Sequence, residues 1–194
     1  MSGLERDALV VNFFGGPGVG KTTAAAMLFV ELKLRSADAE LYDEQARQCI
    51  LTGQVSALEI QPYLFGLQLY RLRTTARHTD IVVMDSPLLL NPIYDKNQST
   101  PLRDLVLEEF YRFRNLNVVM ERPRSGVHSM AGRVHDAAES RVLDERIRRF
   151  LDDSRIPYRT MAGTREDIAH LADDVVADVE AHRVQLPLLA NSGG

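Results

Sequence analysis

The sequence has little lysine, a single cysteine and no long apolar run. Only three of its 23 basic residues are lysines, so its positive charge is almost entirely arginine. Cys49 has no second cysteine to pair with, which fits a reducing compartment and argues against a metal cluster. No apolar run approaches the roughly 18 residues of a membrane span, and Glu5 and Asp7 stand where a signal peptide would be cationic. These absences predict a soluble, cytoplasmic protein with no membrane partner.

Length and charge limit the domain count and the choice of partner. A chain of 194 residues with 45% apolar content suits one compact domain, so we expect a single domain over residues 1–194 with a flexible tail from about residue 187. The formal net charge of −4 argues against broad attraction to nucleic acid. Between Arg112 and Arg149, however, the sequence has nine arginines and five acidic residues, so a local basic groove is possible.

Residues 15–22, GGPGVGKT, match the pattern G-x-x-x-x-G-K-[ST]. Glycines let successive backbone N–H groups point inward around a phosphate, Lys21 can reach the β- and γ-phosphates, and Thr22 offers a hydroxyl to Mg²⁺. An apolar strand before the loop and a helical pattern after it separate this P-loop from a glycine-rich turn with a chance Lys-Thr. The predicted ATP-binding residues are Gly15, Gly16, Pro17, Gly18, Val19, Gly20, Lys21, Thr22 and Thr23.

Strand and helix patterns alternate along the chain. Buried strands are predicted over residues 8–14, 39–43, 80–84, 116–120 and 156–161, and helices over residues 21–35, 58–77, 102–114, 137–152 and 164–181. Residues 91–101 read as a loop. This alternation predicts an α/β protein, a P-loop NTPase three-layer α/β/α fold with a mainly parallel sheet of about five strands. Ligands of such sheets sit beyond the carboxyl ends of the strands, where Gly15, Glu44, Asp85 and Arg122 all fall.

Asp85 ends the apolar strand DIVVM, which should lie beside the P-loop strand. A carboxylate there can hold Mg²⁺ or bind the acceptor hydroxyl; the alternative is a turn aspartate that caps Ser86-Pro87. Serine follows Asp85 where motor-type ATPases place a glutamate to orient the attacking water, and no Asn-Lys-x-Asp follows the fourth strand. Both features favour transfer to a bound acceptor over hydrolysis or a GTPase.

Glu44, at the end of the second predicted strand, is a further candidate on the acceptor side. It could act as a base or grip an acceptor hydroxyl, and it could equally be a helix-opening acid paired with Arg47. Which of Glu44 and Asp85 is the base stays open. Tyr63 and Phe65 are the aromatic residues that could stack on a base.

Residues 121–152 are predicted to form an arginine-rich lid. The first half has glycines, a proline and no periodicity, and a charged helix follows. Arginines neutralise the negative charge that spreads over a migrating phosphoryl group, and Arg133 and Arg141 are the best candidates for this role. A solvated helix face explains the arginines Arg146, Arg148 and Arg149 equally well.

The chain resembles the thymidylate-kinase-like and ribosylnicotinamide-kinase-like P-loop kinases over most of residues 9–163. The segments that carry the resemblance are NFFGGPGVGKTT, YDEQAR, QPYLFGLQLYRL, IVVMDSPLLL, VVMERP and AGRVHDAAESRVLDERI, which look like the motifs of small kinases common in bacteriophage genomes. Some members of that group are 5-hydroxymethyluracil DNA kinases. The resemblance implies that the P-loop would bind ATP, that Glu44 and Asp85 would face the acceptor, and that Arg122 and Arg133 would belong to the lid region.

Residues and resemblance together predict an ATP-dependent kinase that uses Mg²⁺. Its predicted catalytic residues are Lys21, Asp85, Glu44 and Arg133, and its predicted metal ligands are Thr22 and Asp85. The specific expectation is phosphorylation of 5-hydroxymethyluracil in phage DNA, in the host cytoplasm, with the base flipped out to reach the site. The alternatives are a kinase of free nucleosides or nucleotides and, less favoured, a nucleotide-switched regulatory ATPase. Nothing in the sequence indicates the oligomeric state.

Overall fold

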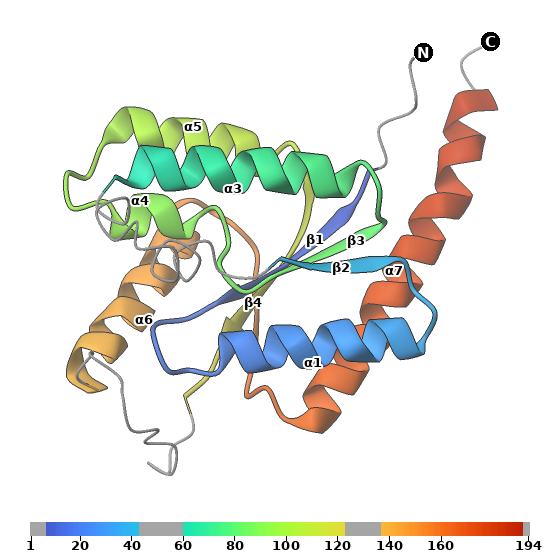
Figure 1. The fold of residues 1–194 in the computed structure, drawn as a ribbon, viewed down its shortest axis with the longest axis horizontal. Coiled ribbons are helices and arrows are strands. Elements are labelled where there is room, and N and C mark those ends of the chain that lie inside the picture. The colour runs from blue at the N-terminus through green and yellow to red at the C-terminus, as the bar shows by residue number, and fades with distance from the viewer. Residues whose placement is uncertain (1–6, 43–59, 123–136, 192–194) are drawn as a thin grey trace.

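The computed structural model describes residues 7–42, 60–122 and 137–191. A five-stranded sheet, with every neighbouring pair parallel, runs through the centre of the molecule in the order β2-β3-β1-β4-β5 (Figure 1). The strands are β1 (Leu9–Phe14), β2 (Ala39–Tyr42), β3 (Ile81–Met84), β4 (Arg114–Met120) and β5 (Arg159–Met161). The fold class predicted from the sequence is therefore confirmed.

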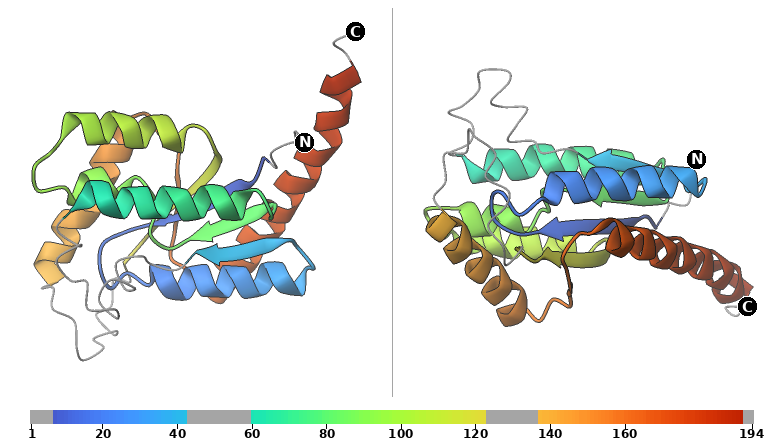
Figure 2. Two further views of the ribbon diagram at one scale, coloured as in Figure 1. Left: turned by 45° about the horizontal axis from the view of Figure 1, so that its top comes forward. Right: turned by 90° about the horizontal axis from the view of Figure 1, so that it is seen from below.

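Helices cover both faces of the sheet. One face packs on α1 (Lys21–Leu34) and α7 (Arg165–Asn191). The other face packs on α3 (Gln61–Ala76), α4 (Leu90–Tyr94), α5 (Thr100–Phe110) and α6 (Ala137–Asp153). Figures 1 and 2 show these two layers, and α7 extends beyond the sheet in each view. Within the described ranges, no helix is both long and apolar enough to cross a membrane.

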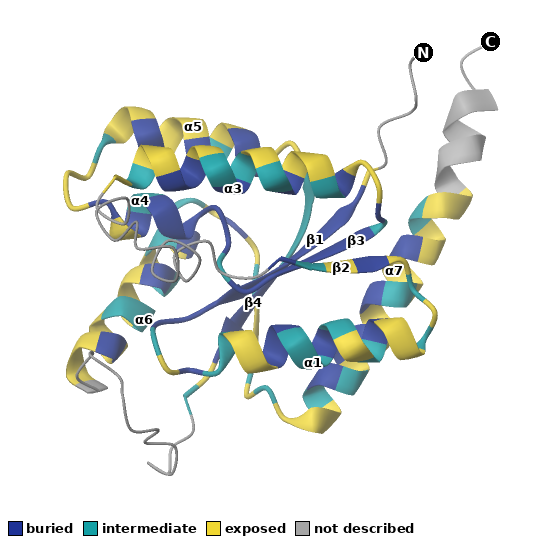
Figure 3. Ribbon diagram, viewed as in Figure 1, coloured by how far each residue is buried: buried dark blue, intermediate teal, exposed yellow. Residues whose placement is uncertain are grey.

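The strand β1 explains why the sequence shows an uninterrupted apolar run before the loop. Val10 and Phe14 pack into the core on the α3 side, whereas Val11 and Phe13 pack on the α1 side. Because both faces are covered, every residue of this strand is buried (Figure 3). The polar exception, Asn12, donates from Nδ2 to the side-chain oxygen of Asn117 on the neighbouring strand β4, at 3.1 Å.

Most predicted elements are present, and several boundaries needed correction. The predicted helix over 102–114 ends at Phe110, because Arg114 already pairs with Leu9 as the first residue of β4. The predicted loop over 91–101 contains most of the short helix α4. The fifth strand covers only Arg159–Met161 of the predicted 156–161.

The last helix begins as predicted and ends later than predicted. Thr164 and Asp167 form the expected capping box: each side chain accepts a hydrogen bond from the other residue's backbone N–H, at 3.1 and 3.0 Å. The helix then continues to Asn191 instead of stopping near residue 181. The helix therefore includes the first residues of the tail predicted from about residue 187, and the flexibility of that tail stays a prediction. Residues 192–194 lie outside the described residues.

Candidate phosphate-binding site

The P-loop connects β1 to α1 in the conformation that its glycines allow. Gly15, Gly18 and Gly20 have φ values of 145°, 81° and 102°, backbone conformations that residues other than glycine rarely adopt. At Gly15 a Cβ atom would also lie 2.7 Å from Cγ1 of Val19. Helix α1 starts at Lys21, and its N-cap, Gly20, provides no side-chain cap to the first backbone N–H groups. An anion at this helix start would meet those amides and the positive end of the helix dipole.

Lys21 lies at the mouth of this loop. Its Nζ donates to the backbone oxygen of Gly15 at 2.6 Å and to that of Gly16 at 3.1 Å. Those two contacts hold the ammonium group over the strand-side half of the loop. Contact of this lysine with the terminal phosphates of a nucleotide stays a prediction of the sequence.

Thr22 and Asp85, the predicted metal ligands, lie next to each other. The Thr22 hydroxyl donates to Oδ2 of Asp85 at 3.0 Å. They meet because β3, which Asp85 follows, pairs directly with β1, and Asp85 is 3% exposed. Hydroxyl and carboxylate oxygens suit Mg²⁺, which usually takes only one or two protein ligands and completes its shell with water and phosphate oxygens. Nowhere in 7–42, 60–122 or 137–191 do three or more His, Cys, Asp or Glu side chains gather as metal ligands.

An ion pair from outside the motif also contacts the P-loop. Arg122, just after β4, donates from Nη2 to the backbone oxygen of Pro17 at 3.0 Å. The same guanidinium pairs with Asp144 of α6. Asp144 in turn accepts a hydrogen bond from the backbone N–H of Gly16 at 2.5 Å. The outer edge of the loop is therefore held by a helix far away in the sequence.

Asp144 was missed by the sequence analysis, which treated its helix as a charged segment. A signal was present: Ser140, Asp144, Ile147 and Leu151 recur at helical spacing, and Ser140, Ile147 and Leu151 are all buried. An acid on the buried face of an amphipathic helix needs a partner, so its position predicts a contact. Which partner it meets cannot be read from the helix alone.

Two of the predicted catalytic residues, Glu44 and Arg133, lie outside the described residues, and so do residues 123–136 of the predicted lid. The stacking role considered for Phe65 is wrong, because its ring is 3% exposed and belongs to the core under α3. Tyr63, two residues earlier, faces outward and is 45% exposed. Helix periodicity causes the difference, since these two residues lie on different sides of α3.

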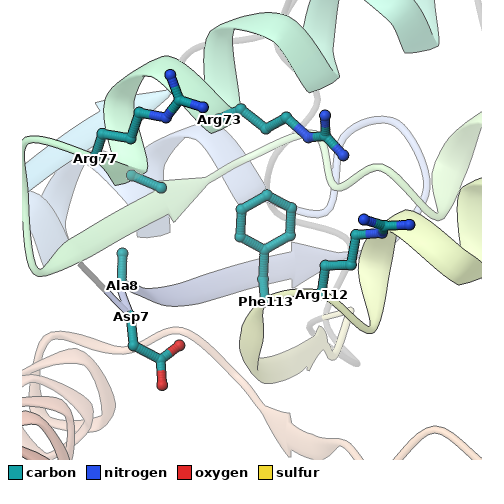
Figure 4. A pocket seen from close by; sticks show the side chains of 7 residues that line it. Asp7, Ala8, Arg73, Arg77, Arg112 and Phe113 are labelled. Carbon is teal, nitrogen blue, oxygen red and sulfur yellow. The ribbon is translucent and has the colours of Figure 1, made fainter. Parts of the chain in front are cut away.

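Two of the hollows in the described part of the chain lie in different places. One, of about 490 Å³, starts at Thr22 and follows α1; it is lined by Thr22, Thr23, Ala26, Met27, Val30, Glu31 and Arg165. The other, of about 550 Å³, lies near Ala8 where β1 begins (Figure 4). Its walls include Arg73, Arg77 and Arg112. Of these two hollows, the first adjoins the P-loop.

Comparisons with known proteins agree with this architecture. The AAA domain family matches residues 10–167. No curated protein matched the chain. The solved structure of NadR protein in complex with NR is similar with a TM-score of 0.66 and 17% identity, over 89% of this chain and 52% of that one. A second structure, of APE1195, has a TM-score of 0.45 and 17% identity, over 91% of this chain and 98% of that one.

The family match and the NadR structure show a family and a fold. The chain spans about half the length of the NadR chain, and at 17% identity that likeness concerns the fold alone. The family match covers most of the chain and includes both the P-loop and Asp85. On this evidence, the chain belongs to the AAA domain family, with the nucleotide-binding fold of P-loop NTPases.

Proposed function

We propose that this protein is an ATP-dependent kinase with a nucleoside-type acceptor. The observation that carries the proposal is the Thr22–Asp85 pair, which joins the P-loop to the end of the neighbouring strand at 3.0 Å. Serine, not glutamate, follows Asp85, so the position from which motor ATPases direct water has no carboxylate. A site that binds phosphates without such a residue is better suited to an acceptor hydroxyl than to hydrolysis.

Each residue near the loop has a part in this proposal. Lys21 and the amides at the start of α1 would hold the β- and γ-phosphates, and Thr22 and Asp85 would hold Mg²⁺, which neutralises phosphate charge. The acceptor oxygen then forms a bond to the γ-phosphorus as the bond to the bridging oxygen of ADP breaks, and the acceptor proton passes to a carboxylate. Since the Asp85 carboxylate already accepts from Thr22, it suits the metal role, and we assign the base to Glu44.

The finer proposal for the acceptor is the hydroxymethyl group of 5-hydroxymethyluracil in DNA. Its support is the resemblance of the sequence motifs, together with the arginine-rich stretch between Arg112 and Arg149. A free nucleoside or nucleotide is the second candidate, favoured by the similar fold of NadR, which was solved with NR bound. The net charge of −4 also favours the second candidate over a DNA polyanion.

Transfer of label from ATP tests both candidates at once. The protein is incubated with Mg²⁺ and γ-labelled ATP and, in parallel, with hydroxymethyluracil DNA, ordinary DNA and a panel of free nucleosides and nucleotides. Label on the modified DNA alone supports the finer proposal, and label on a free nucleoside or nucleotide supports the second. Hydrolysis of ATP that labels no acceptor would contradict a kinase. Salt-sensitive DNA binding with no transfer would favour a nucleotide-switched regulatory ATPase.

A further inference from the structure

The Gly16-Pro17 segment of the P-loop is held at both ends by side chains that lie outside the motif. Asp144 accepts from the Gly16 N–H at 2.5 Å, and Arg122 donates to the Pro17 carbonyl at 3.0 Å. Arg122 and Asp144 also form an ion pair with each other, so the two loop residues and the two side chains are linked in a ring. Arg122 also donates to the backbone oxygen of Ser140, at 3.4 Å, on the same face of α6. We call the Arg122–Asp144 pair the loop brace.

Close packing of the brace explains a glycine that the motif does not require. Position 16 is a free position in the pattern G-x-x-x-x-G-K-[ST]. A Cβ atom on Gly16 would nevertheless lie 2.7 Å from the Ser140 backbone oxygen and 3.0 Å from both Nη2 of Arg122 and Oδ1 of Asp144. A side chain at position 16 would therefore push α6 and the brace away from the loop.

The brace also balances charge beside the phosphate site. The side chains of Arg122 and Asp144 are 26% and 17% exposed, so water screens the pair only partly. While the two are paired, the carboxylate of Asp144 is neutralised. Without Arg122, an unpaired negative charge would stand against the backbone of the loop that receives the phosphates, and it would repel them.

We propose that Asp144 is a positioning residue for nucleotide binding: it holds the Gly16 amide and keeps the Arg122 guanidinium against the P-loop. This inference rests on the proposed function, since it assumes that the loop binds a nucleotide. A glycine-rich loop that is already ordered loses less conformational entropy when the phosphates bind. The positive charge of Arg122 offsets the negative charge of Asp144 beside the P-loop.

The pairing predicts an unusual pattern among variants. Affinity for the Mg²⁺ complex of a non-hydrolysable ATP analogue is measured by calorimetry in Arg122→Gln, Asp144→Asn and the double variant. Arg122→Gln exposes the bare carboxylate and should weaken binding at least about tenfold. Asp144→Asn keeps an oxygen for the Gly16 N–H but loses the ion pair that holds Arg122, so it should weaken binding by a smaller factor than Arg122→Gln. The double variant should bind at least about threefold better than Arg122→Gln, because the unpaired charge is gone.

A second measurement does not depend on nucleotide. Hydrogen exchange of the Gly16 amide is followed by NMR in the free protein for Asp144→Ala and for Glu145→Ala, an exposed acid one residue further along α6. Exchange should accelerate at least about tenfold in Asp144→Ala and stay unchanged in the control, with melting temperatures recorded for both. If Arg122→Gln does not fold, Arg122→Met replaces it in the affinity series.

The outcomes separate this inference from the function on which it rests. An unchanged exchange rate of the Gly16 amide in Asp144→Ala overturns the brace. A double variant that binds the ATP analogue no more tightly than Arg122→Gln does also overturns it. A wild-type protein that binds no nucleotide, with the Gly16 amide still released in Asp144→Ala, overturns the proposed function while supporting the brace. Faster exchange of the Gly16 amide in Asp144→Ala, together with tighter nucleotide binding in the double variant than in Arg122→Gln, supports both the brace and the proposed function.

Discussion

Arginines gather at both ends of the parallel strands, and their partners differ. At the carboxyl end, Arg122 contacts the P-loop backbone as well as Asp144. At the amino end, Figure 4 shows Arg73 and Arg112 on the walls of the hollow. Arg73 pairs with Glu109 at 2.5 Å and Arg112 pairs with Glu108 at 2.6 Å. An arginine-lined hollow is therefore not by itself an anion site, because carboxylates from the same protein can already occupy the guanidinium groups.

The amino-end pairs connect helices and leave the P-loop untouched. Glu109 of α5 is 7% exposed and holds Arg73 of α3, so their contact ties the two helices together. The hydrogen bond that Arg112 donates to Glu108, and then the charge of Glu109, raises the pKa of Arg112. We therefore expect substitutions at this end to change stability, and substitutions at the carboxyl end to change phosphate chemistry.

Lys21→Ala should have the largest effect on activity. Removing the ammonium over the loop should lower phosphoryl transfer at least about a thousandfold, since the lost charge faces the migrating phosphoryl group. The melting temperature should stay close to that of the wild type, because Lys21 is not part of the core. Lys33→Ala is the matched control, an exposed lysine in the same helix. Near-normal turnover in Lys21→Ala would remove the phosphate-site assignment.

Asp85→Asn should have the second largest effect on activity. It keeps the size of the side chain and removes the charge that would hold Mg²⁺, so the rate should fall at least about a hundredfold and recover in part at high Mg²⁺. Asp104→Asn, on the exposed side of α5, is the control. Normal transfer across a Mg²⁺ titration would reduce Asp85 to a turn cap. Glu44→Gln is the companion variant; as the proposed base, it should lower the rate with no recovery at high Mg²⁺, and the opposite pattern in the two variants would exchange their proposed roles.

Glu109→Gln tests the amino end. The substitution weakens the contact with Arg73 and should lower the free energy of unfolding by about 1–2 kcal/mol, the range for a partly screened ion pair with one buried partner. The measurement is urea unfolding, with kcat/KM for the wild type and the variant alongside. A fall in kcat/KM with unchanged stability would reverse the proposed division between the two ends.

Arg112→Gln should have the smallest effect. Its nearer partner, Glu108, is exposed, and the contact of Arg112 with Glu109 is longer, at 3.5 Å. Exposed ion pairs contribute little to stability. Calorimetry with ATP and with pyrophosphate should show affinities equal to those of the wild type. Weaker binding of either ligand would mean that the hollow in Figure 4 accepts anions, and the distinction between the two ends would have to be abandoned.

Features governed by neighbouring residues were predictable from the sequence. The apolar run of β1, the glycines of the loop and the helical pattern after Lys21 lie in direct succession, so strand, loop and helix follow from local conformational preference. The Thr22–Asp85 contact was also predictable, because carboxyl ends of adjacent parallel strands meet at one edge of the sheet. The capping box of α7 needed only residues three apart.

Features governed by packing were decided only by the tertiary structure. Asp144 reaches Gly16 across 128 residues of sequence, and no local pattern states which loop α6 will meet. Phe65 is a second example: its sequence position alone does not say whether the ring faces a ligand or the core, and the packing of α3 places it in the core. By itself the sequence determined the P-loop, its flanking strand and helix, and the parallel fold. Only the packing of α6 decided that an ion pair from outside the motif braces that loop, because such a contact depends on how distant helices seat on the sheet.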